Sequence, residues 1–318
     1  KPQIAVDSAG NALAVWEQND GQQFNIRANR FTPDNGWGTA QTIEADTGNA
    51  REPQIAVDSA GNALAVWRQD DGQQTNIWAN RFTPDNGWGI AETIEADTGY
   101  AYRPQIAVDS AGNALAVWEQ SDGTRDNIRA NRFDADNGWG TAINIEAGTG
   151  NARRVQIAVD SAGNALAVWK QDDGQQFNIR ANRFNADNGW GTAQTIEADS
   201  GQAGDPQIAV DSAGNALAVW EQSDGTRDIR ANRFNAVSGW ETAQTIEADA
   251  GSAGNPQIAV DSAGNAMAVW EQFAGTRKDI WANRFNADNG WGTAQTIEAD
   301  SGQAGDPQIA VDSAGNAL

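Results

Sequence analysis

The chain contains no cysteine and no histidine, and only three of its 318 residues are lysine. Without cysteine it has no disulfide framework. Without histidine it lacks the commonest general base and metal ligand of proteins. No apolar run approaches the roughly 20 residues that a membrane-spanning helix requires, so we expect no membrane insertion.

The balance of charge is strongly acidic. The chain has 43 acidic and 21 basic residues, which gives a formal net charge of −22. A surface of this kind repels phosphate backbones and anionic lipid headgroups, and it favours solubility. We therefore expect no nucleic acid among its partners.

What the chain has in abundance is repetition. The phrase PQIAVDSAGNALAVW begins at Pro2 and returns at steps of 51, 51, 51, 51, 50 and 51 residues, once in a variant form at Val155. A regular period of this length indicates a solenoid, a propeller or an array. The sequence predicts a single repeat domain over 1–318, with repeats 2–52, 53–103, 104–154, 155–205, 206–255 and 256–306 and a partial copy at 307–318.

Each repeat has the pattern of four short strands joined by turns. In the first repeat we expect strands at 3–7, 12–17, 25–31 and 39–45, separated by segments rich in Gly, Asn and Asp. A sheet that is apolar on both faces needs neighbours, and radial repetition about an axis provides them. The coils of a linear β-solenoid, the alternative, are usually much shorter. The predicted fold is all-β, a β-propeller of six four-stranded antiparallel blades.

The two ends of the chain carry the same strand, because 307–318 repeats the sequence of 2–13. A ring of six blades has room for only one of these copies. The other copy is displaced, pairs with another molecule, or belongs to a longer array. Since an unpaired strand edge is an association site, we expect self-association through residues 307–318.

The repeated phrase, with its D-x-x-G-N turn, resembles the opening of NHL-type propeller repeats. The fuller unit, with AVW ending at Trp16 and GWGTAQ around Trp37, looks like a family of amplified repeats in secreted or surface bacterial proteins. It is also distantly similar to Asp-box (sialidase-like) propellers and propeller lectins. The Asp-box pattern S-x-D-x-G-x-x-W is not met, because Ala56 stands where its Ser belongs. The resemblance implies the fold and a secreted or cell-surface location.

The aspartate of the repeated turn has two interpretations. As a calcium ligand, it would combine with backbone carbonyls, and Asp58, Asp109 and Asp160 are the weak candidates. As a structural residue, its carboxylate accepts hydrogen bonds from nearby backbone N–H groups. The spacing of an EF-hand loop is absent. We therefore predict a structural turn and no cofactor, with calcium as the alternative.

Tryptophan forms two series that recur in every repeat. The series that begins at Trp16 is predicted to pack between blades. The series that begins at Trp37 follows polar, Gly-rich turns, where an indole can stack on a sugar. Two further tryptophans replace an arginine of the other repeats, which indicates a half-exposed groove position. The candidate ligand-binding residues are Trp37, Trp78, Trp88, Trp139, Trp190, Trp240, Trp281 and Trp291.

The repeats differ from one another mainly in two connections, which a meander brings to the same end. These are the loop around 19–24 and the segment around 49–52, with their copies. Drift of unconstrained loops explains the variation as well as specialisation does. The only tyrosines, Tyr100 and Tyr102, lie in one of these variable connections.

The repetition argues against catalysis. Glycosidase chemistry needs an asymmetric set of carboxylates, whereas similar blades supply six similar environments. Sialidase-like chemistry would also need an arginine cluster and a tyrosine nucleophile. We predict a non-catalytic, lectin-like module for binding or adhesion, not an enzyme, with a glycan or a surface protein as its partner. The alternatives are a self-associating structural building block and a glycan-degrading enzyme.

Overall fold

The computed structural model describes residues 2–44, 47–95, 97–197, 200–223, 225–247, 251–298, 302–312 and 315–317. These residues form strands and turns, with no helix among them. They fall into two compact units, the first ending at Glu146 and the second beginning at Ala147. Each unit contains three of the six sheets, and the prediction of a single repeat domain stays a prediction.

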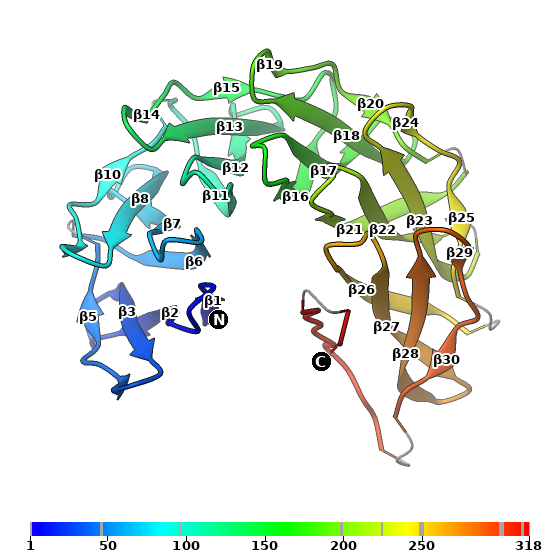
Figure 1. Cartoon of the computed structure of the whole chain (residues 1–318). Coiled ribbons are helices and arrows are strands. Elements are labelled where there is room, and N and C mark those ends of the chain that lie inside the picture. The colour runs from blue at the N-terminus through cyan, green and yellow to red at the C-terminus, as the bar shows by residue number, and fades with distance from the viewer. Residues whose placement is uncertain are drawn as a thin grey trace. The chain divides into compact units, whose positions relative to one another are not determined.

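The first unit contains three sheets, one for each of its repeats (Figure 1). Their strands are β1 Gln3–Val6, β2 Ala12–Asn19, β3 Phe24–Thr32, β4 Gly36–Trp37, β5 Gln41–Thr42; β6 Ala50–Val57, β7 Ala63–Asp70, β8 Thr75–Thr83, β9 Gly87–Trp88, β10 Glu92–Thr93; and β11 Ala101–Val108, β12 Ala114–Ser121, β13 Asp126–Asp134, β14 Gly138–Trp139, β15 Ile143–Asn144.

The second unit repeats the same order of strands. Its strands are β16 Ala152–Val159, β17 Ala165–Asp172, β18 Phe177–Asn185, β19 Gly189–Trp190, β20 Gln194–Thr195; β21 Gln202–Val210, β22 Ala216–Ser223, β23 Arg227–Asn235, β24 Gly239–Trp240, β25 Gln244–Thr245; and β26 Ala253–Val260, β27 Ala266–Ala274, β28 Arg277–Asn286, β29 Gly290–Trp291, β30 Gln295–Thr296. Six antiparallel sheets in succession confirm the predicted all-β fold of six propeller blades, numbered 1 to 6 below.

The outer edge of each blade differs from the prediction. Instead of one fourth strand at 39–45, two strands of two residues each, β4 and β5, pair with β3. Between them Gly38 N donates to Arg30 O at 2.8 Å, which keeps the chain close to β3 without regular pairing. Residue 45, the last of the predicted strand, lies outside the described residues.

From blade 2 onward, the first strand of a blade is longer than predicted. In blade 2, β6 begins at Ala50 and pairs with β7 from Ala50↔Gln69 onward, with a register shift between Arg51 and Gln54. At this bulge Glu52 adopts φ +56° immediately before Pro53. The segment expected to be a variable connection is therefore part of the innermost strand.

The core of each unit lies between neighbouring blades. In the first unit, Val15, Ile26 and Ile43 of blade 1 pack against Ala65 and Trp67 of blade 2. In the second unit, Val219 and Ile246 of blade 5 pack in the same way against Trp270 of blade 6. The Trp16 series therefore packs between blades, as predicted, with Trp67, Trp118, Trp169, Trp220 and Trp270 all fully buried.

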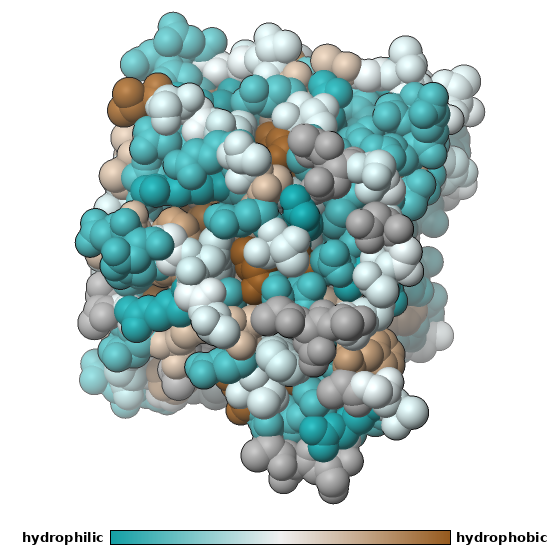
Figure 2. Space-filling model, turned by 90° about the vertical axis from the view of Figure 1, so that its right-hand side faces the viewer, coloured by the Kyte–Doolittle hydropathy of each residue, from teal (hydrophilic) through white to brown (hydrophobic). Residues whose placement is uncertain are grey.

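Hydrophobic residues are sparse on one side of the second unit. Seen from the side of β25, β29 and β30, the surface is mainly hydrophilic, and hydrophobic residues form small separate spots (Figure 2). Val237 is one of the few strongly exposed hydrophobic residues of this unit. Among the described residues, no helix is long and apolar enough to span a membrane.

Candidate functional site

The candidate site lies at the start of blade 3, where the chain has a tyrosine beside the bulge of the first strand. Tyr102 lies in β11, next to the bulge of this strand, and not in a loop as the sequence suggested. Its hydroxyl donates a hydrogen bond to Oδ1 of Asp126, the first residue of β13. Asp126 is buried and Tyr102 is half-buried, so the phenol connects a buried carboxylate with the surface.

A cation lies beside this phenol. The Nη1 atom of Arg103 is 2.9 Å and 3.2 Å from the two carboxylate oxygens of Glu119. The Glu119 side chain is completely buried, whereas that of Arg103 is 45% exposed. The guanidinium carbon is 5.7 Å from the centre of the Tyr102 ring. The buried Glu119 carboxylate thus holds the Arg103 guanidinium in place, and part of the hydrogen-bonding edge of the guanidinium stays accessible to solvent or a ligand.

Glu52 connects the site to blade 2. Its Oε2 accepts a hydrogen bond from the backbone N–H of Arg103 at 3.0 Å, and its Oε1 is 3.3 Å from Nε of Arg68. Arg103 has φ +51°, the same left-handed conformation as Glu52 at the equivalent bulge. The bulge turns its N–H toward Glu52, and the resulting network spans two neighbouring blades.

A polar pocket of about 370 Å³ lies at the same end of blade 3. Within it, Nη2 of Arg129 is 2.6 Å from Oδ2 of Asp97. Arg125, next to Asp126 in sequence, places Nη2 3.1 Å from Oε1 of Glu146. The volume falls within the range of small-molecule sites. The lining residues are Asp97, Thr98, Gln120, Ser121, Asp122, Arg125, Asn127, Arg129 and Asn144.

Glu95 is buried two residues before Asp97, which lines this pocket, but Glu95 itself does not line it. Its Oε2 accepts a hydrogen bond from Asp97 N at 2.9 Å. Burial raises the pKa of the Glu95 carboxyl to about 7, because the charged form loses its hydration. The carboxylates of Asp97 and Asp71 raise this pKa further, and the Asp97 N–H and the guanidinium of Arg129 oppose the rise.

Tyr102, Arg103, Glu119 and Asp126 were not predicted as functional residues. The signal available in the sequence was the pair of tyrosines in a connection that varies between repeats. Asp126 and Glu119 carried no such signal, since their relation to Tyr102 depends on the registers Tyr102↔Glu119 and Ser121↔Asp126.

Six of the predicted ligand-binding tryptophans, the Trp37 series, lie in the short outer strands, one in each blade. Each member of the Trp37 series faces a phenylalanine of its own blade, with ring centroids 5.4 to 5.5 Å apart. Trp37 is exposed, and Trp88, Trp139, Trp190, Trp240 and Trp291 are half-buried. The sheet register therefore gives the series a packing role, and its ligand-binding role stays a prediction.

The two tryptophans that replace arginine lie across from the Trp16 series. Trp78 pairs with Trp67, and Trp281 pairs with Trp270. Both are half-buried and pack against the core between their blade and its neighbour. In blade 1 the equivalent Arg27 instead donates to Ala40 O at 3.0 Å. A groove at these positions stays a prediction.

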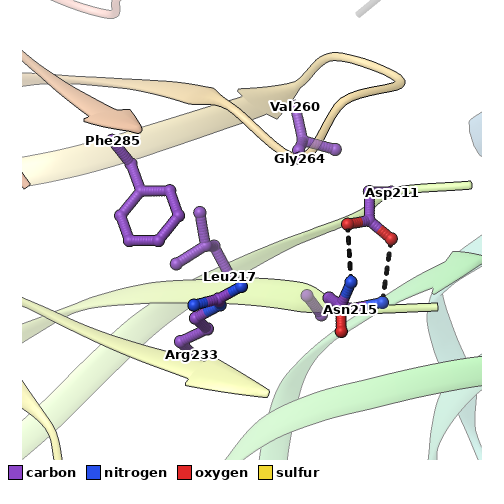
Figure 3. Close-up of a pocket in the computed structure, with 8 residues that line it drawn as sticks. Asp211, Asn215, Leu217, Arg233, Val260, Gly264 and Phe285 are labelled. Carbon is purple, nitrogen blue, oxygen red and sulfur yellow. Dashed lines mark hydrogen bonds between the residues drawn. The ribbon is translucent and has the colours of Figure 1, made fainter. Parts of the chain in front are cut away.

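The aspartate of the repeated turn is fully engaged within the turn. In blade 5, Asp211 accepts hydrogen bonds from the backbone N and from Nδ2 of Asn215, both at 2.9 Å (Figure 3). Arg233 and Phe285 line the same cavity of about 10 Å³, which is room for little more than one water molecule. A Cβ on Gly264 of the next blade would lie 2.9 Å from Oδ2 of Asp211.

The calcium candidates Asp58, Asp109 and Asp160 make the same turn contacts, each accepting from the asparagine four residues later. Among the described residues, no group of three or more acidic side chains gathers in a way that would hold a metal ion. These contacts favour the structural interpretation of the turn, and the calcium alternative stays untested.

Comparison with known proteins identifies the fold but no family. No family model matches the chain, and no curated protein sequence matches it significantly. Solved structures do match over most of the chain. A PL25 polysaccharide lyase, an ulvan lyase bound to a GlcA–Rha3S glycan, has a TM-score of 0.58 at 10% identity, covering 94% of this chain and 80% of its own.

Two further structures show the same likeness. The intramolecular trans-sialidase of Ruminococcus gnavus, in complex with oseltamivir carboxylate, has a TM-score of 0.52 at 9% identity over 90% of this chain and 94% of its own. The α-L-arabinofuranosidase Arb93A of Fusarium graminearum has a TM-score of 0.52 at 12% identity over 91% and 93%. At these identities the likeness shows the fold: the chain is a six-bladed β-propeller similar to sialidase-like and other glycan-active propellers.

These neighbours correct the functional prediction made from the sequence. A non-catalytic binding or adhesion module that is not an enzyme was expected, yet the similar structures are mainly enzymes that act on glycans. The argument from six similar environments fails at blade 3, where the pair of Tyr102 and Asp126 occurs once. Membership of the NHL or Asp-box repeats is not confirmed.

Proposed function

We propose that the chain is a glycan-processing enzyme that cleaves a carboxylate-bearing glycan at the end of blade 3 where Tyr102 and Asp126 lie. The observation that carries this proposal is the hydrogen bond from the Tyr102 hydroxyl to buried Asp126, with the guanidinium of Arg103 beside the phenol ring. No other tyrosine of the chain pairs with a carboxylate among the described contacts, which gives the propeller one asymmetric centre.

The chemistry follows from the positions of these groups. Asp126 accepts the phenolic proton, and the Tyr102 oxygen then attacks the anomeric carbon as a nucleophile or removes a carbon-bound proton as a base. In either mode the glycosidic C–O bond breaks, and the proton held by Asp126 passes to the leaving oxygen. The nearby guanidinium stabilises the negative charge on that oxygen. Arg103 also offers a planar donor edge to a substrate carboxylate. Tyr102, Arg103 and Asp126 do not line the pocket of about 370 Å³, but Arg125 and Asn127, on either side of Asp126 in sequence, do. We propose that this pocket takes the sugar next to the scissile bond.

In this proposal the tryptophan candidates bind the glycan and take no part in its cleavage. Trp78 and Trp88, in blade 2 of the same unit, are positions where further sugars of a chain would stack. A secreted or cell-surface location, which the sequence resemblance implies, would give the chain access to glycans outside the cell. The location itself remains a proposal.

The test uses the two tyrosines as a matched pair. Tyr102→Phe keeps the ring but removes the hydroxyl, and Tyr100→Phe makes the same change at a side chain that is 58% exposed. Glycans containing uronic or sialic acids are incubated with each variant, and new reducing ends are measured. We expect Tyr102→Phe to lose about 10²- to 10⁴-fold in rate and Tyr100→Phe to match the unmodified chain.

The same assay separates the two modes of cleavage. Proton abstraction followed by elimination creates a C=C bond that absorbs in the ultraviolet, whereas attack by the tyrosine oxygen followed by hydrolysis does not. Equal rates for Tyr102→Phe and the unmodified chain would refute the assignment. Failure to cleave any acidic glycan, with ready cleavage of a neutral one, would refute the substrate class.

A further inference from the structure

One residue of the candidate site, Arg103, has a backbone conformation that needs support from its surroundings. Its φ of +51° lies in the left-handed region, and Pro104 follows it. Residues other than glycine rarely adopt this conformation, and a following proline makes it less favourable still. The contact made by the Arg103 N–H therefore helps to decide where its guanidinium and the preceding Tyr102 lie.

At two other junctions, a glutamate of one blade accepts the N–H of the equivalent residue in the next blade. Oε2 of Glu17 in β2 accepts from Glu52 N at 3.3 Å. Oε1 of Glu221 in β22 accepts from Asn255 N at 2.8 Å. Both donors have the same left-handed conformation, with φ of +56° and +53°. A glutamate on the second strand thus supports this conformation at each of these junctions.

Blade 2 lacks this glutamate. Arg68 has the equivalent position in β7, and a guanidinium has no acceptor to offer. Glu52 supplies the acceptor instead, because its Oε2 accepts from Arg103 N at 3.0 Å. Its Oε1 lies 3.3 Å from Nε of Arg68, and the Glu52 side chain is 40% exposed. Arg68 therefore limits the movement of a carboxylate that could otherwise turn toward solvent.

We infer that Glu52 and Arg68 are positioning residues for Arg103. Arg68 orients the Glu52 carboxylate, and this carboxylate fixes the N–H of Arg103 and with it the left-handed bulge. Neither residue needs to touch the glycan, since both act through Arg103. The inference rests on the proposed function, in which Arg103 binds the carboxylate of the substrate.

Arg103 is held at two points, and the two have different consequences. At its tip, Nη1 is 2.9 Å and 3.2 Å from the carboxylate oxygens of Glu119. At its backbone, Glu52 fixes the direction in which the side chain leaves β11. Loss of the Glu52 carboxylate leaves the tip paired but lets the backbone move. The guanidinium then meets the substrate carboxylate in a poorer geometry, so binding weakens while the fold is kept.

The first test compares Glu52→Ala with Glu221→Ala, which removes the same kind of hydrogen bond in blade 5. Initial rates are measured against the concentration of an acidic glycan that the unmodified chain cleaves. Glu52→Ala is expected to raise KM and to lower kcat/KM about 10- to 100-fold, since a small displacement of a binding group has effects of this size. Glu221→Ala is expected to keep the KM of the unmodified chain, because lower stability alone reduces only the number of active molecules.

The second test restores the glutamate found at the other junctions. Arg68→Glu, added to Glu52→Ala, places a carboxylate at the position from which Glu221 accepts the Asn255 N–H. This double variant is expected to recover most of the kcat/KM that Glu52→Ala loses. Arg68→Leu in the same background has no acceptor and is expected to recover none. Equal recovery with Leu and Glu would overturn the inference, because removal of the cation would then suffice.

The outcomes separate this inference from the proposed function. If the unmodified chain cleaves an acidic glycan and Glu52→Ala keeps its KM, Glu52 is not a positioning residue and the proposed function stands. Failure of Arg68→Glu to recover activity, in a double variant that melts at the same temperature as Glu52→Ala, would also overturn the inference alone. If the unmodified chain cleaves no acidic glycan, the inference and the proposed function fail together.

Discussion

At the scale of single residues, Glu95 shows how a repeated residue acquires an individual property. A glutamate follows isoleucine at this position in every repeat. In blade 2 the burial of this carboxyl, together with Asp97 and Asp71, outweighs the Asp97 N–H and Arg129 and raises its pKa to about 7. The group therefore titrates near neutral pH, although nothing in the sequence distinguishes it from its copies.

This titration predicts how stability depends on pH. The pKa of Glu95 rises from an ordinary 4.5 to about 7 on folding, so the folded state holds the proton more tightly. Its contribution is fully present below pH 4.5 and is lost as the pH rises from 4.5 through 7, by on the order of 1 to 3 kcal/mol in total. Glu95→Gln keeps an acceptor for Asp97 N but does not titrate.

The measurement is the melting temperature as a function of pH. Relative to the unmodified chain, Glu95→Gln should be more stable at pH 8 and equally stable at pH 4.5. Glu92→Gln, at an exposed position of β10, is the control and should follow the unmodified curve. Parallel curves for Glu95→Gln and the unmodified chain would contradict the raised pKa.

At the scale of elements, the sequence predicted the strands that have a clear pattern of apolar and polar residues. β3 alternates apolar and polar residues, β2 begins with a short apolar run from Ala12 to Trp16, and the DSAGN turn is marked by Gly, Asn and Asp, so these elements were predicted. β4 and β5 are two residues each and too short to show alternation. The bulge at Arg51 and Gln54 interrupts the alternation of β6, which is why the start of this strand was interpreted as a connection.

The same bulge explains why the candidate site was missed. Tyr102 and Arg103 lie at its copy in blade 3, where the register shifts between Tyr102 and Gln105. A left-handed residue before proline is unfavourable and is not expected from sequence. Only the structure shows that this conformation brings Arg103 to Glu119 and its N–H to Glu52.

The turn between the first two strands of blade 3 is expected to be intolerant of a side chain at Gly112. This residue has φ +84°, and a Cβ there would lie 2.9 Å from Oδ2 of Asp58 in blade 2. Gly72 has a similar φ of +88° with nothing within 4 Å. Alanine at Gly72 should cost about 1 kcal/mol from backbone strain alone.

Alanine at Gly112 should cost roughly 1 to 3 kcal/mol more, because it also disturbs the hydrogen bonds of the Asp58 carboxylate. Urea denaturation of both variants gives the two free energies of unfolding. Equal losses would show that Asp58 moves aside freely and that the contact between the turns adds nothing to stability.

At the scale of the whole molecule, charge and the proposed substrate act against each other. The net charge of −22 repels an anionic glycan at long range, whereas Arg103 attracts its carboxylate at contact. Salt weakens the long-range repulsion more than the contact between Arg103 and the carboxylate. The reason is that the screening length falls from about 30 Å at 0.01 M to about 8 Å at 0.15 M ionic strength.

The KM for an acidic glycan should therefore fall as salt is raised over this range, while kcat stays constant because the reacting groups are in contact. The KM for a neutral glycan, where one is cleaved, should not change. The measurement is the initial rate against substrate concentration at several ionic strengths. A KM that rises with salt would mean that the protein attracts the anionic glycan at long range. That result would contradict our expectation that the surface as a whole repels the glycan and that Arg103 alone attracts its carboxylate at contact.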